Sequence, residues 1–507
     1  MNFIQISLRE NGPGVKRLLP LLCGLLLFGL RVYSASVELR IHGTSLSLDA
    51  RNASVYDILS AFASYGISVE AQPGIQTFFN GILSETPIDE ALDRILRNFP
   101  HNTTWREIPY GGGFLRILSG IQVYASSPSD PDPLKRIAPG PRKIATRSSG
   151  EAYVADELLL GLRAGTDLNA FRRLLASMGG QVISAHIQSG IYRIRLPRNT
   201  NLQALLDQLA QNDLVALAEP NFIYPLIRAP RGGETYPAVN GTAAPTLRIP
   251  SDIQPALAII DSGLNQEYVP AQILRASHDV TGANLPREDP VGHGTHMAMI
   301  AAGISATPGH GPGGEAVPLV TIRALDADGN THSFAILESL TLAAEAGARV
   351  ISMSWGAYTE STLLSYAFAQ AADQGLLLLA SAGNDGKARL MFPASHPSVL
   401  SVGAAGPDGS REPYSNHGPE LDLLAPGTAV LNDGALRTVL RGTSMATPWV
   451  AAALTAYFSR HPGATPEDAV SALRASLIPD VSGKNKTPGL FNEAARAQFL
   501  QTEKTDQ

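Results

Sequence analysis

Three short apolar runs in the second half of the chain constrain its fold most strongly. They are ALAII at 256–260, ARVISM at 348–353 and LLLLA at 376–380. Strands that are apolar along their whole length are buried on both faces, which is typical of a parallel sheet covered by helices. Because helical patterns alternate with these runs, residues 251–500 are predicted to form an α/β domain built on a parallel sheet.

Small and polar residues follow each of these runs. Asp261 follows the first run, Ser354-Trp355-Gly356 follows the second, and the third leads to Asn384. In an open parallel sheet, ligands bind beyond the carboxyl ends of the strands. These residues are therefore predicted to lie together at the functional edge of the sheet.

The stretch RGTSMATPWVAAAL, residues 441–454, places Ser444 at the start of an apolar helix. A serine in this position is most often an N-cap that accepts a hydrogen bond from a backbone N–H, so capping competes with a catalytic role. Pro448 follows four residues later. It is expected to be tolerated because N–H groups in the first helical turn have no carbonyl partner.

The stretch GHGTHMAMIAAG places His293 at another helix start, between Gly292 and Gly294. His293 and His296 are three residues apart, which raises the possibility of a metal site, but no HExxH pattern and no third ligand accompany them. The alternative makes His293 a general base whose flanking glycines allow backbone and substrate to approach closely. His296 is then expected to pack within the helix or to support His293.

Together these positions supply the residue types that nucleophilic catalysis requires. The chemistry needs a weakly nucleophilic alcohol, a base with a pKa near neutrality and a buried carboxylate that orients the base. Ser444, His293 and Asp261 are of these types. Asn384 adds a side-chain N–H that can donate to a developing oxyanion.

Five motifs resemble those of the subtilisin family of serine peptidases, in the same order along the chain: IIDSG, GHGTH, SMSWG, SAGN and GTSMATP. The resemblance implies Ser444 as the nucleophile, His293 as the general base and then acid, and Asp261 as the orienting carboxylate. It also implies an oxyanion site between Asn384 and the backbone N–H of Ser444, where the helix dipole favours negative charge.

The same resemblance implies how a polypeptide substrate would bind. The substrate would add a strand to Ser354-Trp355-Gly356, and its P1 side chain, before the scissile bond, would enter a pocket lined by Ala380, Ala382 and Gly383. Met391 aligns with a position at the floor of this pocket that is often glycine in the family. A shallower P1 pocket is therefore expected.

Residues 151–226 are predicted to form a small α+β domain ahead of the catalytic one. The expected order is strand, helix, strand, strand, helix, strand, with the helices starting at Asp167 and Asn201. The stretches GIYRIRLP and VALAEPN resemble the propeptide of subtilisin-type proteases, which implies an inhibitory prodomain. Residues 227–250 would then be the activation linker, in which the precursor is cut.

Residues 37–125 are predicted to form another small α+β domain. Helices are expected after the cap residue Ser54, and after Thr86 with Pro87 in the first helical position. The stretches LSLDARNASVYDILSAFASYGISVEAQPG and TPIDEALDRIL resemble the short N-terminal domain of secretins and TonB-dependent receptors. This implies a docking module for an envelope protein of a Gram-negative-type cell. Residues 126–150, rich in Pro and Ser, are expected to be a mobile linker.

Residues 1–36 are predicted to be a signal peptide. Lys16 and Arg17 precede an apolar segment from Leu18 to Leu30, which is shorter than the roughly 20 residues of a membrane-spanning helix. The chain's one cysteine, Cys23, lies in this segment, so the processed protein is expected to have no disulfide.

The composition is that of a folded protein with several domains. The chain has 507 residues, 44% of them hydrophobic and 17% charged, and its net charge of −6 without any Lys/Arg-rich run argues against nucleic-acid binding. The prediction is an exported, periplasmic or extracellular serine endopeptidase, made as an autoprocessed precursor. It is expected to act as a monomer without a cofactor or catalytic metal, and structural calcium is left open. The alternatives are a catalytically silent subtilisin-like scaffold and an envelope-assembly docking protein.

Overall fold

The structure is a computed structural model that describes the chain from residue 36 to residue 501. Some internal segments are not described: 111–112, 129–131, 138–142, 198, 231–233, 238–246, 249–254, 284, 307–313, 433–435 and 480–487. Except for Ser36, the predicted signal peptide lies outside the described residues, and so does Cys23. None of the helices in the described part of the chain is long and apolar enough to cross a membrane.

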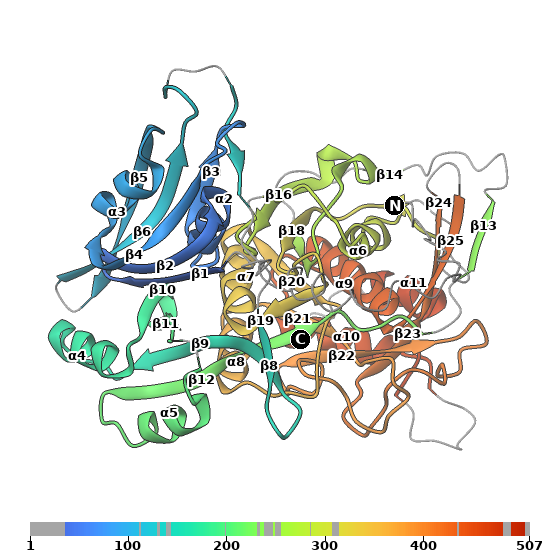
Figure 1. The fold of residues 1–507 in the computed structure, drawn as a ribbon. Coiled ribbons are helices and arrows are strands. Elements are labelled where there is room, and N and C mark those ends of the chain that lie inside the picture. The colour runs from blue at the N-terminus through green and yellow to red at the C-terminus, as the bar shows by residue number, and fades with distance from the viewer. Residues whose placement is uncertain are drawn as a thin grey trace, which may run out of the picture.

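The C-terminal half of the chain is built on a seven-stranded sheet in which every pairing is parallel (Figure 1). The order across the sheet is β16, β18, β15, β20, β21, β22, β23. Their bounds are β15 Ala256–Asp261, β16 Leu274–Asp279, β18 Leu319–Arg323, β20 Ala348–Met353, β21 Leu377–Ser381, β22 Val399–Ala405 and β23 Leu423–Pro426. The predicted parallel α/β fold is confirmed.

Helices cover both faces of this sheet because alternate side chains of each strand point in opposite directions. Leu257 and Ile259 of β15 pack with helices α6, α9, α10 and α11, whereas Ala258 and Ile260 pack with α7 and α8 on the other face. The bounds are α6 His293–Ala301, α7 Ser333–Glu345, α8 Thr362–Asp373, α9 Thr443–Arg460, α10 Pro466–Ser476 and α11 Glu493–Gln501, with short 3-10 turns at Gln266–Tyr268 and Ala271–Ile273.

Helix α9 lies in the middle of the domain and is buried from Thr443 to Phe458. Its N-cap is Gly442, so Ser444 is not the cap residue. Pro448 lies in the second helical turn, so the expectation that it belongs to the first turn is wrong. The carbonyl of Ser444, which an N–H at position 448 would have bonded, instead accepts a hydrogen bond from Ser354 Oγ at 3.3 Å.

The preceding α+β unit has the predicted order of elements. Asp167 and Asn201 cap its two helices, as expected. Its strands pair in the order β10, β11, β9, β12, and the end of β12 also pairs with β19 of the C-terminal domain. The bounds are β9 Ala152–Leu162, α4 Leu168–Met178, β10 Gln181–His186, a 3-10 turn at Ile187–Ser189, β11 Ile191–Arg195, α5 Leu202–Leu209, β12 Val215–Pro225 and β19 Asn330–His332.

Residues 36–137, here called the N-terminal module, contain two sheets, in the orders β1-β2-β4 and β5-β6-β3-β7. Ser54 forms a capping box with Asp57 at the start of α2, as its predicted role requires. At α3 the N-cap is Pro87 and not Thr86, which is still part of β4 and pairs with Leu46 of β2. The bounds are β1 Ser36–His42, β2 Ser45–Ser54, α2 Val55–Ala63, β3 Ser68–Ala71, β4 Phe78–Pro87, α3 Ile88–Leu96, β5 His101–Tyr110, β6 Gly113–Val123 and β7 Lys135–Arg136.

The expected linkers contain paired strands in the part of the chain that is described. Within 126–150, β7 pairs with β3 and β8 pairs with β9, so this segment is not the free linker that its composition indicated. Within 227–250, β13 pairs with β25 and β14 pairs with β17. The bounds are β8 Ile144–Thr146, β13 Glu234–Pro237, β14 Leu247–Arg248, β17 Gly314–Glu315, β24 Thr428–Asn432 and β25 Leu436–Arg441.

Candidate active site

Asp261 and His293 meet at the carboxyl edge of the sheet. Asp261 is the last residue of β15 and is 1% exposed, and His293 is the first residue of α6. His293 Nδ1 lies 2.8 Å from Asp261 Oδ1, which also accepts the backbone N–H of Ser262 at 2.7 Å. This is the contact through which a carboxylate orients an imidazole base.

A glycine allows this contact to form. The backbone N–H of Gly294 donates to Ser262 Oγ at 2.8 Å, so the start of α6 lies directly against the end of β15. A Cβ at position 294 would lie 2.3 Å from the carbonyl oxygen of Gly263, closer than any side chain permits. The glycine beside His293 thus brings two backbone segments together, in agreement with the close approach predicted for it.

Asp289 fixes the same region and was not identified from the sequence. Its carboxylate accepts hydrogen bonds from Ser262 Oγ, from the backbone N–H of Gly292, and from the N–H and Oγ1 of Thr295, at 2.7–2.8 Å. It therefore ties the strand that ends in Asp261 to the helix that begins with His293. The sequence signal was an acidic residue just ahead of a helix start, where carboxylates commonly bind free N–H groups.

The charges around His293 favour its protonated form. Burial by itself would lower the pKa of this imidazole, but the charge of Asp261, the hydrogen bond to Asp261 and the charge of Asp289 together raise the pKa above its usual value. A raised pKa strengthens the imidazole as a base and stabilises the cation that it becomes after taking a proton.

Ser444 lies at the start of α9 and is 2% exposed. Its Oγ has no hydrogen-bond partner within the described residues. The structure thus joins Asp261 to His293 by a hydrogen bond but does not join His293 to Ser444.

Asn384 is held with its amide N–H directed at a backbone carbonyl. The N–H and Oγ1 of Thr443 donate to Asn384 Oδ1 at 2.9 and 3.0 Å, and Asn384 Nδ2 donates to the carbonyl of Arg228 at 3.0 Å. Gly442 is required beside it, because its φ is +149° and a Cβ there would lie 2.9 Å from Asn384 Nδ2. Thr443 was not identified from the sequence, since its role depends on this tertiary contact.

The predicted substrate-binding strand is paired with the chain itself. The N–H of Gly356 donates to the carbonyl of Pro225 at 3.1 Å, and Leu226 forms an antiparallel bridge with Trp355. The indole of Trp355 is fully buried and donates to the carbonyl of Ile260 at 2.9 Å. The backbone of Trp355 is therefore paired with Leu226 while its side chain is buried, and Ser354 supports the carbonyl of Ser444 as described above.

The residues predicted for the P1 pocket lie next to one another. Ala380 and Ala382 are fully buried, and the N–H of Met391 donates to the carbonyl of Ala382 at 3.1 Å. Met391 also lies against two glycines. A Cβ added at Gly356 would lie 3.3 Å from Met391 Cβ, and a Cβ added at Gly383 would lie 3.1 Å from Met391 Cγ. The methionine thus occupies the space between Gly356 and Gly383, which follows the end of β21.

His296 lies in α6, and burial lowers the pKa of its imidazole. The described residues contain no group of three or more His, Cys, Asp or Glu side chains arranged to hold a metal ion.

The fold and this combination of residues define the class of serine hydrolases that use an Asp-His-Ser triad. The chain belongs to the subtilase family: that family matches residues 253–494, and the fervidolysin N-terminal prodomain matches residues 139–221. The prodomain match begins inside the segment that was predicted to be a linker, where β8 pairs with β9.

Subtilisins are among the relatives of this chain. Subtilisin of Bacillus pumilus is 31% identical over 248 residues, which cover 48% of this chain and 90% of that protein. Subtilisin E of Bacillus subtilis (strain 168) is 30% identical over 248 residues, and the match spans 65% of its length. The predicted membership of the subtilisin family and the predicted prodomain are confirmed by these matches.

A solved structure shares the fold. The crystal structure of fervidolysin from Fervidobacterium pennivorans, a keratinolytic enzyme related to subtilisin, aligns with a TM-score of 0.56 at 20% identity. The alignment covers 71% of this chain and 62% of that chain.

The raised pKa of His293 predicts where activity is lost in acid. A general base must be neutral, so kcat/KM should fall as the pH drops through a midpoint above 6.5, the ordinary value for histidine. The measurement is the pH profile of kcat/KM for a neutral peptide substrate. A midpoint at or below 6.5 would contradict the electrostatic role of Asp261 and Asp289.

The position of Asn384 predicts a loss of turnover when its amide is removed. Asn384→Ala should keep the fold and lower kcat by about 10²–10³-fold, the loss known for the corresponding donor of subtilisin. Steady-state kinetics with a peptide substrate measure it, and circular dichroism checks the fold. Equal kcat for the two proteins would remove Asn384 from the mechanism.

Proposed function

We propose that this subtilase is an exported serine endopeptidase, made as a precursor that cuts its own chain just after the prodomain. The observation that carries the proposal is the path of residues 225–228. They leave β12, add an antiparallel strand to Trp355-Gly356, and present the carbonyl of Arg228 to Asn384 Nδ2. A peptide substrate would bind a protease in this way.

Two bonds of this segment are candidates for the cut. Within residues 225–230 only Ile227 is buried, at 5% exposure, whereas Arg228 is exposed. Burial of Ile227 favours cleavage between Ile227 and Arg228, and the contact of Asn384 with the next carbonyl favours cleavage between Arg228 and Ala229. The proposed cut is therefore at one of these two bonds.

The proposed catalytic roles of the residues are as follows. Ser444 Oγ attacks the carbonyl carbon while His293 takes its proton, and the new oxyanion is stabilised by Asn384 Nδ2 and the backbone N–H of Ser444. His293 then gives the proton to the leaving amine. Water hydrolyses the acyl-enzyme by the same steps in reverse, and Asp261 stabilises the imidazolium each time.

The prodomain is expected to inhibit the enzyme after the cut. Glu219 accepts hydrogen bonds from Ser361 Oγ and from the N–H of Thr362 at the start of α8, and Asn221 Oδ1 accepts the N–H of Phe334 at the start of α7. With β12 also paired to β19, the product end of the chain remains held in the cleft. The prodomain must leave before other polypeptides can enter.

The remaining parts of the proposal rest on the sequence. The apolar segment from Leu18 to Leu30 supports export to the periplasm or beyond, and the secretin-like and TonB-receptor-like stretches of residues 37–125 support an envelope partner. The enzyme would act as a monomer on polypeptides and would need no cofactor. A silent scaffold and an assembly protein are the rival functions.

Labelling and self-cleavage together test the proposal. The wild-type chain should react with a serine-directed phosphonate probe and yield a fragment that starts at Arg228 or Ala229, whereas Ser444→Ala should do neither. The cut should occur at a rate independent of protein concentration, because the linker is tethered beside the site at high effective concentration. Gel electrophoresis and mass spectrometry of the fragments measure these outcomes.

Three results would count against this function. A wild-type chain that neither reacts with the probe nor cuts itself would be a scaffold. Cleavage of Ser444→Ala at the same bond, in a preparation free of other proteases, would show that Ser444 is not the nucleophile. A rate that rises with concentration would show cleavage between molecules.

Met391 predicts the P1 preference. Met391 lies between Gly356 and Gly383, where a glycine would make the P1 pocket deeper. The kcat/KM should therefore be higher for substrates with a small or medium apolar P1 residue, such as Ile, than for substrates with Phe or Tyr. Met391→Gly should raise kcat/KM for substrates with Phe or Tyr at P1 relative to Ala. The measurement is a peptide series varied at P1. A wild-type enzyme that already prefers Phe or Tyr would refute the prediction.

A further inference from the structure

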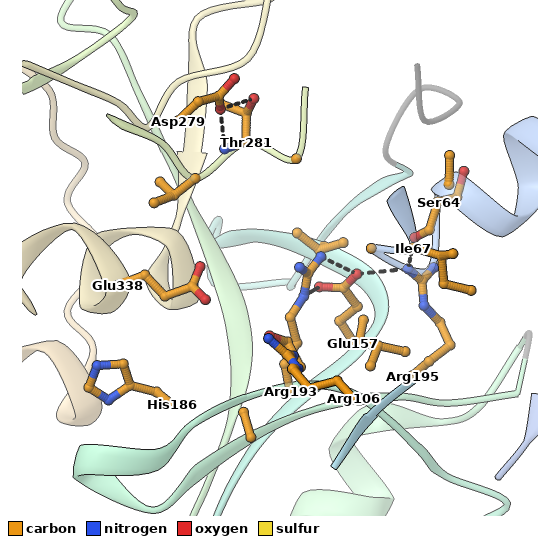
Figure 2. Close-up of a pocket in the computed structure, with 18 of the residues that line it drawn as sticks. Ser64, Ile67, Arg106, Glu157, His186, Arg193, Arg195, Asp279, Thr281 and Glu338 are labelled. Atoms are coloured by element: carbon orange, nitrogen blue, oxygen red, sulfur yellow. Dashed lines mark hydrogen bonds and ion pairs between the residues drawn. The ribbon is translucent and has the colours of Figure 1, made fainter. Parts of the chain in front are cut away.

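The N-terminal module, the prodomain and the catalytic domain meet around one cavity of about 620 Å³. The module lies against both other units, beside α7 of the catalytic domain and above β10 and β11 of the prodomain (Figure 1). Figure 2 shows the cavity with Glu157 of the prodomain between Arg193 and Arg195, and Glu338 of α7 reaching toward them from the opposite wall. Charged side chains from all three units thus converge here.

One set of contacts joins the module to the prodomain. Arg195 of β11 donates to the carbonyl of Ser64 at 2.6 Å and lies 5.0 Å over the ring of Tyr65. On the other side, Ile108 of β5 is almost fully buried in the hydrophobic core of the prodomain, together with Leu160 and Phe171. The contact therefore includes apolar burial as well as charge.

A second set of contacts joins the module directly to the catalytic domain. Arg136 of β7 donates to the carbonyl of Gly282, and the charge of Asp279 lies near the same guanidinium. Arg106 of β5 lies close enough to Glu338 for its charge to act on that carboxyl group. None of these residues belongs to the candidate active site.

We propose that the N-terminal module is a clamp that retains the cleaved prodomain on the catalytic domain, so that self-cleavage alone does not free the active site. This regulation rests on the proposed function. After a cut at 227–229, the module and the prodomain remain on one fragment. That fragment is held by the cleft strand and, at the same time, by the module's own contacts with the catalytic domain. Two linked attachments retain a fragment far longer than either one alone.

The clamp should also respond to pH through Glu338. Burial raises the pKa of this carboxyl group to about 7, while the charges of Arg193 and Arg106 act in the opposite direction. Release of the fragment exposes Glu338, which then regains a pKa near 4.5. Because the pKa is higher in the assembled state, retention is strongest below pH 4.5 and weakens as the pH rises through 7.

Another titratable group at the junction has the opposite effect. His186 Nε2 of the prodomain lies 2.8 Å from Thr341 Oγ1 of α7, and burial lowers the pKa of His186 while the charge of Glu345 raises it. Protonation of His186 therefore weakens retention as the pH falls below 6.5. The role of Glu338 must be measured against a variant that differs only at Glu338.

The test measures release without relying on the chain's own activity. In full-length Ser444→Ala, a recognition sequence for an added protease is inserted between Ala229 and Pro230. The nicked protein is diluted, and dissociation of the N-terminal fragment is followed by size-exclusion chromatography. Arg136→Ala should speed release by about tenfold, the equivalent of one charge-assisted hydrogen bond. Arg106→Ala, made separately, should speed release by about two- to fivefold, because it removes only a charge interaction of an exposed side chain. Arg94→Ala, on the exposed face of α3, should leave the rate unchanged.

The outcomes separate the clamp from the peptidase. Release at the Ser444→Ala rate in both Arg136→Ala and Arg106→Ala would overturn the clamp, whether or not the wild-type chain cuts itself. Faster release in Arg94→Ala as well would also overturn it, since the effect would then not belong to the junction. Because no catalysis is needed, a failure here leaves the proposed peptidase function intact.

The pH arm uses Glu338→Gln in the same background. The release rate of the protein that keeps Glu338 is divided by the release rate of the Glu338→Gln variant. This ratio should rise about 10- to 100-fold between pH 5 and pH 8, because only the carboxyl group of Glu338 becomes charged. The His186 contribution cancels in the ratio. A ratio that stays constant with pH would overturn the role of Glu338.

Discussion

A single extended stretch of backbone connects the prodomain to the candidate active site. β12 pairs with β9 inside the prodomain, its end pairs with β19, and the next residues pair with Trp355-Gly356. Main-chain hydrogen bonds of this kind do not depend on side-chain identity, so the cleft that receives residues 225–228 can receive other polypeptides. The precursor and a substrate complex thus share one mode of binding, and regulation becomes a question of what keeps this strand in place.

Much of the fold follows from local patterns, and the failures are instructive. The mainly apolar runs that became β15, β20 and β21 predicted the sheet, because strands buried on both faces are largely apolar on both. The strand β7 was missed because its two residues, Lys135 and Arg136, are held by pairing with β3, far away in the chain. The strand β8 pairs with β9, which follows it directly, but β8 has only three residues and lies in a segment whose composition indicated a linker. The reason that Pro448 is tolerated was also not predicted, because it depends on a hydrogen bond from Ser354, which no local pattern indicates.

The candidate site also combines residues that local motifs predicted with contacts that only the folded chain shows. The sequence alone pointed to Asp261, His293, Ser444 and Asn384, because each lies in a short motif near the end of a strand or the start of a helix. Their supporting contacts come from tertiary structure: Thr443 orients Asn384, and Asp289 joins the loops around His293. The carbonyl of Arg228 in front of Asn384 could not be predicted either, since only the folded precursor shows where the linker runs.

The capping of α7 and α8 explains how the prodomain could stabilise these helices of the catalytic domain and still dissociate from it. Glu219 binds N–H groups at the start of α8, yet Ser361 Oγ of the catalytic domain itself accepts the N–H of Leu364 at 3.0 Å. At α7, His332 Nδ1 likewise accepts the N–H of Ala335 at 3.0 Å. Each helix therefore keeps a cap of its own after release, and the groups that lose the prodomain's carboxylate and amide become accessible to water. In the proposed function, departure of the prodomain would therefore cost interface contacts without undoing either helix start. The strength of attachment, to which the proposed clamp contributes, would then set when the cleft opens.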